Sequence, residues 1–318
     1  MDIKKSIIAI IPCYKGGFTT LDLINKCFEY VDQVILIDDQ CPLKTGEMAI
    51  DNIKDKRLTV LFNDRNLGVG GSVKKAFSYL LDIDFDVLIK LDADGQMDPN
   101  EIPKLVNPIL NRDADVIKGN RFFYIDQLSQ MPKIRLIGNL CISFLARAAT
   151  GYWELFDPTN GFIAFNSNTL RRIRLHKLDD RYFFESDLLF QCSLANIYFK
   201  QLPMKSIYKN EMSSLKPIKE ITRFSILHLR NFIKRIIYQY FILDFNAGTL
   251  EIIGFILGIC SSSFYYFYIK FFGLEEGTSA SPSQANLLAI SIIISFQLLL
   301  SFIFFDTTQK PLMRRIKD

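Results

Sequence analysis

Two long stretches near the C-terminus of the chain carry no charged side chain. Ile252–Ile269 is one of them, and Gly277–Phe305 is the other, with its apolar centre at Ala285–Phe305. A helix rises about 1.5 Å per residue and the hydrocarbon core of a bilayer is about 30 Å thick, so each stretch is long enough to cross a membrane once its flanks are counted. The sequence therefore predicts a transmembrane helical hairpin. The alternative is a pair of buried helices in a soluble core.

Basic residues flank this hairpin on both outer sides. The connection Gly273–Gln284 holds two glutamates and no lysine or arginine, whereas lysines and arginines are frequent before Ile252 and after Phe305. The positive-inside rule places the two basic flanks on one side of the membrane. We therefore expect a multi-pass protein of the inner (cytoplasmic) membrane with both termini in the cytoplasm.

The segment before the hairpin, Ile218–Phe245, repeats its apolar residues at helical spacing. The stripe consists of Ile226, Leu229, Ile233, Ile236, Ile237, Tyr240 and Phe241. A stripe flanked by arginine and lysine is typical of a helix in the headgroup layer, although an amphipathic helix packed on a globular domain gives the same pattern. We expect three parts: a globular domain over residues 1–215, juxtamembrane helices over 216–247 and the hairpin over 248–318.

Residues 1–210 alternate short apolar runs with helical stretches. The apolar runs are Ile7–Pro12, Val34–Asp38, Leu58–Phe62, Val87–Leu91 and Val116–Ile117. The helical stretches are Thr19–Val31, Thr45–Ile53, Gly71–Leu81 and Pro99–Leu110. This alternation predicts an α/β fold with a mostly parallel sheet whose strands are buried on both faces.

Polar residues gather where the predicted strands end, and ligands of such folds bind beyond the carboxyl ends of the strands. Asp38 and Asp39 end one run, and Asp92 and Asp94 follow another, with Gln96 two residues later. Carboxylates in this position suit Mg²⁺ or Mn²⁺, which take oxygen ligands and share coordination with substrate phosphates. The alternative for Asp92 and Asp94 is a loop with helix-capping aspartates.

Composition and missing motifs exclude several functions. A net charge of only +4 argues against a nucleic-acid partner. Six cysteines without a Cys-x-x-Cys pair, and only two histidines, argue against a disulfide scaffold or a zinc finger. The first predicted strand is not followed by Gly-x-Gly-x-x-Gly, and a Walker loop is absent, so a dinucleotide or ATP site is not expected.

Four motifs together resemble glycosyltransferase family 2, with its GT-A (Rossmann-like) fold. They are Ile11-Pro12-x-Tyr14, Ile37-Asp38-Asp39, Asn66-Leu67-Gly68-x-Gly70-Gly71 and Leu91-Asp92-Ala93-Asp94-Gly95-Gln96. More narrowly, the chain resembles the polyprenyl-phosphate sugar transferases of the dolichol-phosphate mannose synthase type. The motifs shared with that subgroup continue with Gly119-Asn120-Arg121, Arg135 and Asp157-Pro158-Thr159-Asn160-Gly161-Phe162. The resemblance covers about residues 6–215, and the two spans match a bacterial branch.

The resemblance implies an inverting hexosyltransferase that uses Mg²⁺ or Mn²⁺. The donor would be a UDP- or GDP-linked sugar, and the acceptor polyprenyl (undecaprenyl) phosphate at the cytoplasmic face of the membrane. Its product would serve cell-surface glycan assembly or modification. The lipid bilayer would be a further partner, and the hairpin is compatible with a membrane homo-oligomer.

The resemblance also implies roles for individual residues. Those implied for donor binding are Pro12, Tyr14, Asp38, Asp39, Asn66, Gly68, Gly71 and Asp92. Those implied for the metal are Asp92, Asp94 and Gln96, and those for the acceptor phosphate are Arg121, Arg135 and Asn139. Asp94 and Asp157 are the implied catalytic residues.

Three questions stay open at this point. Asp157 acts either as a general base or as an orienting group, and Glu185 and Asp187 are rival base candidates. The acceptor is alternatively a hydroxyl of a lipid-linked saccharide. A catalytically dead membrane scaffold is a third interpretation, against which the intact set of Asp92, Asp94 and Gln96 argues.

Overall fold

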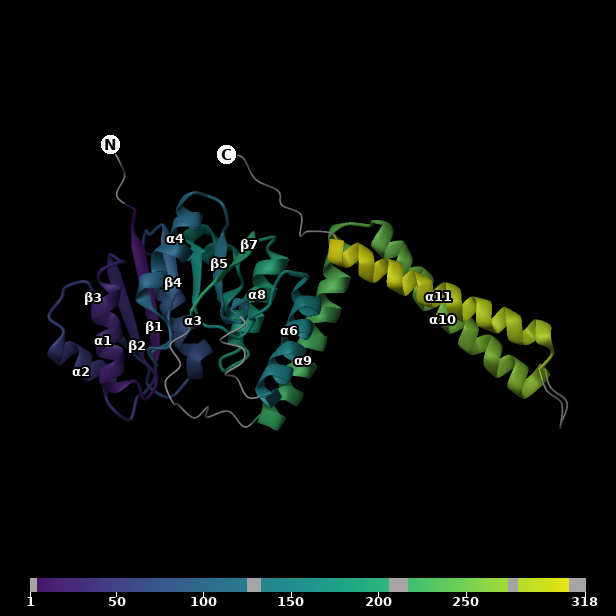
Figure 1. Cartoon of the computed structure of the whole chain (residues 1–318), viewed down its shortest axis with the longest axis horizontal. Coiled ribbons are helices and arrows are strands. Elements are labelled where there is room, and N and C mark those ends of the chain that lie inside the picture. Colours follow the sequence, from purple (N-terminus) through teal and green to yellow (C-terminus); the bar gives the residue numbers. More distant parts are fainter. Residues whose placement is uncertain (1–4, 125–132, 206–216, 274–279, 309–318) are drawn as a thin grey trace. The chain divides into compact units, whose positions relative to one another are not determined.

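The computed structural model describes residues 5–124, 133–205, 217–273 and 280–308 (Figure 1). The chain forms two compact units, one reaching to Phe232 and one that begins at Ile233. The first unit holds the sheet and the second holds the two long apolar helices. Each unit is described by itself.

A seven-stranded sheet with the order β3-β2-β1-β4-β6-β5-β7 forms the centre of the first unit. The strands are β1 (Ile7–Cys13), β2 (Gln33–Asp38), β3 (Leu58–Phe62), β4 (Val87–Lys90), β5 (Val116–Asn120), β6 (Ile163–Asn166) and β7 (Phe199–Pro203). Only β6 runs antiparallel to its neighbours, β4 and β5. The predicted α/β fold with a mostly parallel sheet is confirmed, and β6 and β7 extend it beyond the predicted strands.

Helices cover both faces of this sheet. They are α1 (Gly17–Cys27), α2 (Thr45–Asn52), α3 (Gly68–Leu80), α4 (Ile102–Leu110), α6 (Lys133–Thr150), α7 (Ser167–Arg172) and α8 (Phe184–Leu194). Successive residues of β1 point to opposite faces, so Ala9 and Ile11 join the core under α1 and α4, while Ile8 and Ile10 join the core under α3 and α8. Because both faces are covered, the strands read as unbroken apolar runs.

The helix α9 (Pro217–Ile237) packs on α8 and the residue before it through Phe224, His228 and Asn231, and not through the apolar stripe. Asn231 donates a 2.8 Å hydrogen bond to Asp187 of α8, and the buried ring of His228 packs edge-on against Phe183. Leu229, from the predicted stripe, is 57% exposed. Ile226, also from the stripe, is 63% exposed, so the globular core leaves this part of the stripe uncovered, whereas Tyr240 of the stripe is buried within the second unit.

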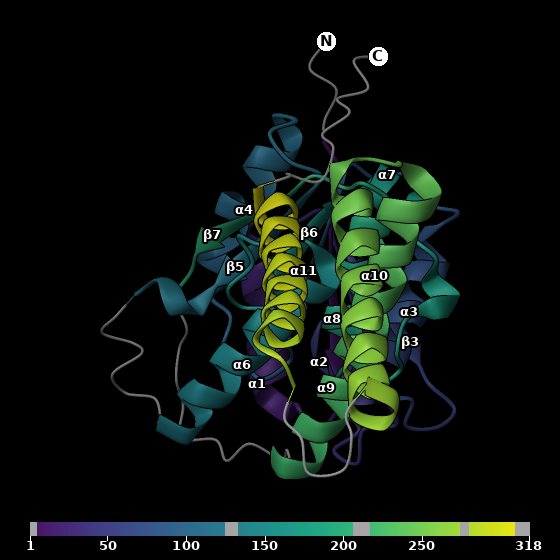
Figure 2. The same cartoon turned by 90° about the vertical axis from the view of Figure 1, so that its right-hand side faces the viewer.

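The second unit contains the predicted hairpin. Within the described residues, the helices over Ala247–Phe272 and Pro282–Thr308 are long and apolar enough to cross a membrane. The first comprises α10 (Ala247–Tyr268) and the turn after it, and the second is α11. The two helices lie side by side (Figure 2), and small side chains allow the approach, with Ser262 and Ser291 hydroxyls 2.7 Å apart.

A buried ion pair ties the ends of the second unit together. Arg235 donates to both carboxylate oxygens of Asp306, at 2.6 and 2.8 Å. The Tyr240 hydroxyl donates to the same carboxylate at 2.7 Å. Two charges removed from water are stable only when their hydrogen-bonding capacity is met, as it is in this bidentate arrangement.

The buried His228 predicts a pH-dependent stability of the first unit. Neither ring nitrogen has a hydrogen-bond partner among the described residues, and burial lowers the pKa of His228 from 6.5 to about 4. Between these pH values the unfolded chain binds a proton that the folded chain does not. Stability is therefore complete above pH 6.5 and falls toward pH 4 by about 3 kcal/mol, since one pKa unit is about 1.4 kcal/mol.

Thermal unfolding of the full-length protein in detergent, followed at pH 7, 6 and 5, measures this effect. The variant His228→Leu keeps an apolar contact with Phe183 and should lose most of the pH dependence. Identical slopes in the two proteins would contradict the assignment.

Candidate active site

The predicted functional residues meet at one edge of the sheet. Strands β1 to β5 all run in the same direction, so their carboxyl ends share this edge. Strand β6 runs the opposite way and enters from the same edge, which brings the segment Asp157–Gly161 beside the ends of β4 and β5. The sheet thus assembles loops that lie far apart in the sequence.

The carboxylates of Asp38 and Asp39 accept hydrogen bonds from backbone N–H groups. Asp38 accepts the N–H groups of Cys41 and Gly46, each at 2.7 Å, and is 4% exposed. Asp39, which is 3% exposed, accepts the N–H of Gly68 at 2.8 Å and that of the preceding residue at 2.7 Å. The two aspartates therefore fix the loops after β2 and β3. Their implied contacts to a nucleotide stay a prediction.

The loop before α3 is held from outside by the segment before α8. Gly68 has a φ of +84°, which favours glycine, and a methyl group at Gly70 would overlap the Asp179 carbonyl. Arg181 donates a 2.7 Å hydrogen bond to the side chain of Asn66. Arg181 is a neighbour of the implied donor pocket that sequence reasoning missed. At the end of β1, Pro12 is buried while Tyr14 is 51% exposed.

The Asp92–Gln96 loop presents carboxylates at the centre of the edge. The Asp92 side chain is 33% exposed, and Asp94 accepts the N–H of Gln96 at 2.9 Å. The described residues contain no cluster of three or more His, Cys, Asp or Glu side chains that would hold a metal on its own. The pair fits a hard cation whose remaining ligands are phosphate oxygens of a bound nucleotide.

Two buried lysines lie behind these carboxylates. Lys90, the last residue of β4, places its ammonium 2.6 Å from Asp92 and 3.2 Å from Glu185. Lys118 of β5 donates to the Asn160 carbonyl, and burial lowers its pKa to about 8. Sequence reasoning missed both residues. The sequence feature that could have revealed each of them is a lysine within or directly after an otherwise apolar predicted strand.

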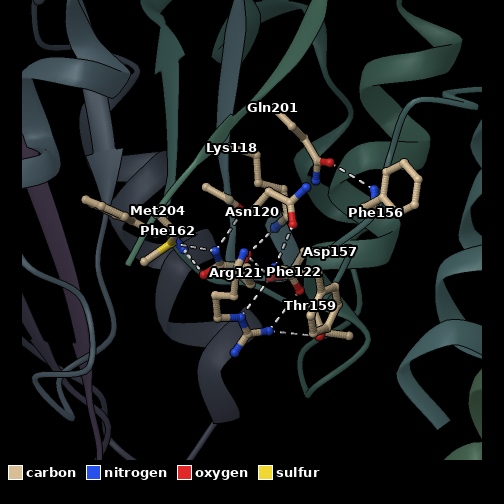
Figure 3. Close-up of polar contacts among 12 residues, drawn as sticks. Lys118, Asn120, Arg121, Phe122, Phe156, Asp157, Thr159, Phe162, Gln201 and Met204 are labelled. Atoms are coloured by element: carbon tan, nitrogen blue, oxygen red, sulfur yellow. Dashed lines mark hydrogen bonds and ion pairs between the residues drawn. The ribbon is translucent and has the colours of Figure 1, made fainter. Parts of the chain in front are cut away.

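Arg121 and Asp157 form a bidentate ion pair at the end of β5 (Figure 3). Arg121 Nε lies 2.7 Å from Asp157 Oδ2, and Nη2 lies 2.8 Å from Oδ1. The Asp157 side chain is fully buried, whereas 19% of the Arg121 side chain is exposed. Asp157 thus orients the guanidinium, with Thr159 as a further neighbour.

The structure separates the remaining candidates. Arg135 lies in α6, and its side chain is outside the described residues, while Asn139 is half-buried on the same helix. Asp187 holds α9 through Asn231, so its carboxylate serves a helix contact. Of the two rival bases, only Glu185 reaches the edge, through Lys90.

Double-mutant analysis tests the Arg121–Asp157 pair. Arg121→Ala leaves a buried carboxylate without its partner and should destabilise the fold by about 3 kcal/mol, as should Asp157→Ala. Because the two residues act together, the double variant should lose at least ~1 kcal/mol less than the sum of the single losses. Denaturant unfolding of the three variants measures the coupling, and strictly additive losses would show that the pair contributes nothing as a unit.

The chain is similar in sequence to known glycosyltransferases. A family model described as glycosyl transferase family 2 matches residues 8–174. A UDP-N-acetylglucosamine–dolichyl-phosphate N-acetylglucosaminyltransferase of Methanococcus voltae is 24% identical, over 70% of this chain and 94% of its own length. An undecaprenyl-phosphate mannosyltransferase of Micrococcus luteus is 27% identical, over 62% of this chain and 82% of its own length.

A solved structure shares the fold. Glucosyl-3-phosphoglycerate synthase of Mycobacterium tuberculosis, in complex with Mn²⁺, UDP and glucosyl-3-phosphoglycerate, has a TM-score of 0.54 at 16% identity. The match covers 73% of this chain and 80% of that one, and it shows that the first unit has the GT-A fold. Since the family model covers more than half of the 318 residues, the chain belongs to glycosyl transferase family 2 and is a glycosyltransferase.

Proposed function

We propose that this enzyme transfers a hexose, with inversion, from a UDP- or GDP-linked sugar to the phosphate of a membrane polyprenol such as undecaprenol. The supporting observation is the segment Asp157–Gly161. At one end Asp157 pairs with Arg121, and at the other Gly161 packs so closely on Asp92 that a methyl group would overlap its carboxylate. Five residues span at most about 15 Å between their first and last Cα atoms. This short span supports a proposed acceptor-phosphate site at Arg121 and a proposed cation site at Asp92 that serve the two substrates of one transfer reaction.

The proposed residue roles follow from charge. Asp92 and Asp94, assisted by Gln96, would bind a divalent cation, which neutralises the charge of the leaving diphosphate. Arg121 would bind the acceptor phosphate, because guanidinium donors match phosphate oxygens and its side chain stays 19% exposed at this edge. A phosphate oxygen then attacks the anomeric carbon as the bond from that carbon to the diphosphate oxygen breaks.

The state of the candidate bases favours a phosphate acceptor over a sugar hydroxyl. A phosphate is already an anion near neutral pH, whereas a hydroxyl needs a base to remove its proton. Asp157 and Glu185 are both engaged with cationic side chains, and Asp187 holds α9. Each of the three carboxylates therefore already serves a contact within the protein, which supports an acceptor that needs no base.

Relatives support this choice of substrates. The two similar enzymes named above act, by their names, on dolichyl phosphate and undecaprenyl phosphate. The solved structure of the same fold holds Mn²⁺ together with UDP, which supports Mg²⁺ or Mn²⁺ as cofactor here. The donor roles of Pro12, Tyr14 and Asn66 belong to this proposal.

A membrane-held enzyme suits such an acceptor. Each CH₂ group taken from lipid into water costs about 0.8 kcal/mol, so a polyprenyl chain stays in the bilayer and the enzyme must come to it. The two apolar helices support attachment to a membrane, and the basic residues that flank them support the inner membrane with both termini cytoplasmic. In this proposal residues 1–215 catalyse, 216–247 lie at the interface and 248–318 anchor, and a homo-oligomer of anchors stays a prediction.

A panel of nucleotide sugars tests the proposal. The full-length protein is incubated with each donor, undecaprenyl phosphate and Mg²⁺ or Mn²⁺, and the lipid product is identified by mass. We expect one donor to give polyprenyl-phosphate hexose and free nucleoside diphosphate. Turnover that requires a saccharide acceptor would show the hydroxyl-directed alternative instead, and no turnover with any pair would favour a scaffold.

Asp94→Ala should abolish this transfer, because it removes a proposed cation ligand, while the protein stays folded and membrane-bound. Asp84→Ala, which removes an exposed carboxylate before the first residue of β4 and so at the other end of that strand from Asp94, is the matched control and should keep full activity. Initial rates and membrane fractionation measure both. Wild-type turnover of the Asp94 variant would rule out the metal role.

Arg135→Ala should raise the KM for undecaprenyl phosphate at least tenfold and the donor KM less than threefold, because its proposed partner is the acceptor phosphate. Steady-state kinetics with each substrate varied in turn give the two values. An equal rise in both would contradict the acceptor role.

A further inference from the structure

Lys90 carries a charge at a place where charge is costly. It ends the central strand β4, and its side chain is 0% exposed. A lone ammonium in the interior costs several kcal/mol, so its two carboxylate partners, Asp92 and Glu185, make the position tolerable. The proposed chemistry uses Asp92 and leaves Lys90 without a role.

The orientation of Asp92 depends on this lysine. In the described part of the chain, Lys90 is the only hydrogen-bond donor to the Asp92 carboxylate, through Oδ1 at 2.6 Å. Asp38 and Asp39, by contrast, are each held by two backbone N–H groups. One oxygen of a partly exposed carboxylate is therefore fixed by a side chain that solvent does not reach.

Lys90 is itself anchored from another element. Glu185 belongs to α8, its side chain is 11% exposed, and its Oε1 lies 3.2 Å from the Lys90 ammonium. Gly161 closes over the pair, because a methyl group there would overlap both Lys90 Nζ and Asp92 Oδ2. The lysine is thus held between the sheet, α8 and the loop that carries Asp157.

We propose that Lys90 is a positioning residue of the donor site: anchored by Glu185, it holds the Asp92 carboxylate in the orientation that receives the divalent cation and the donor diphosphate. The inference rests on the proposed function, since that function assigns Asp92 to the donor. Lys90 itself touches neither substrate and acts through Asp92.

The test asks whether Lys90 orients the Asp92 carboxylate or only neutralises the charge of Glu185. Lys90→Met alone leaves Glu185 as a buried carboxylate without a partner and should lose stability. The double variant Lys90→Met with Glu185→Met replaces the pair by apolar side chains of similar volume, a change that commonly preserves stability. Lys90→Arg keeps a cationic donor for Asp92 and is the conservative control.

Binding of UDP and of GDP in the presence of Mn²⁺ is measured by calorimetry on the full-length proteins in detergent, next to their thermal unfolding. We expect the double variant to unfold within a few degrees of wild type and to bind the nucleoside diphosphate at least tenfold more weakly. The KM for undecaprenyl phosphate should change less than threefold. Lys90→Arg should bind within threefold of wild type.

Two results would overturn the proposal. One is wild-type affinity of the folded double variant, which would reduce Lys90 to a neutraliser of Glu185. The other is a loss of nucleotide affinity of tenfold or more in a folded Lys90→Arg variant, a result that needs no comparison with the double variant. If wild type binds the nucleotide but transfers no sugar to any polyprenyl phosphate, the proposed function fails while the role of Lys90 stands.

Discussion

Opposite charges placed inside the protein at one edge of the sheet are the constraint on which the site depends. Lys90 ends β4 and Arg121 follows β5. The buried Lys90 pairs with Asp92 and with the nearly buried Glu185, and Arg121 pairs with the fully buried Asp157. An unpaired charge in such a place costs several kcal/mol, whereas a paired one holds its partner in a defined orientation. The loop Asp157–Gly161 joins the two pairs, so the position of each follows that of the other.

The same edge uses its other acidic residues to shape the backbone. Asp38 and Asp39 satisfy N–H groups at the starts of α2 and α3, where a helix leaves donors without partners. Glycines at 68 and 70 then let the loop lie against the segment before α8. Asp92 and Asp94 differ from that pair of aspartates, since Asp92 accepts from the Lys90 ammonium and its side chain stays 33% exposed, and Asp94 accepts the N–H of Gln96.

Much of the architecture could be predicted from the sequence, since apolar runs and helical spacing reveal parallel strands buried on both faces. The two long apolar helices could be predicted as well, because an uncharged run of eighteen residues such as Ile252–Ile269 is typical of a long apolar helix. The antiparallel strand β6 was missed because it is only four residues long and directly follows a loop motif. A short apolar run of this kind does not reveal its direction or its neighbours.

The sequence predicted candidate residues of the site, but it did not predict which of them contact one another. Arg121 and Asp157 were expected to act on substrate separately, yet the structure joins them, a contact between residues 36 positions apart that no local pattern predicts. Lys90 and Glu185 are 95 positions apart. In the sequence, a lysine at the end of an apolar run indicates only where the run stops, because its partner is not visible there. On α9, spacing showed which residues share a face, but the buried Phe224, His228 and Asn231 show that a mixed face beside the apolar stripe is the one that packs on the globular core.

The central claim is that a divalent cation and a donor diphosphate bind together at Asp92 and Asp94. The most direct measurement is a structure of the full-length protein with Mn²⁺ and the preferred nucleoside diphosphate, with the cation located by its anomalous scattering. We predict one Mn²⁺ ion that contacts an oxygen of Asp92 or Asp94 and an oxygen of the diphosphate. A cation bound away from both carboxylates, with the diphosphate elsewhere on the molecule, would contradict the account.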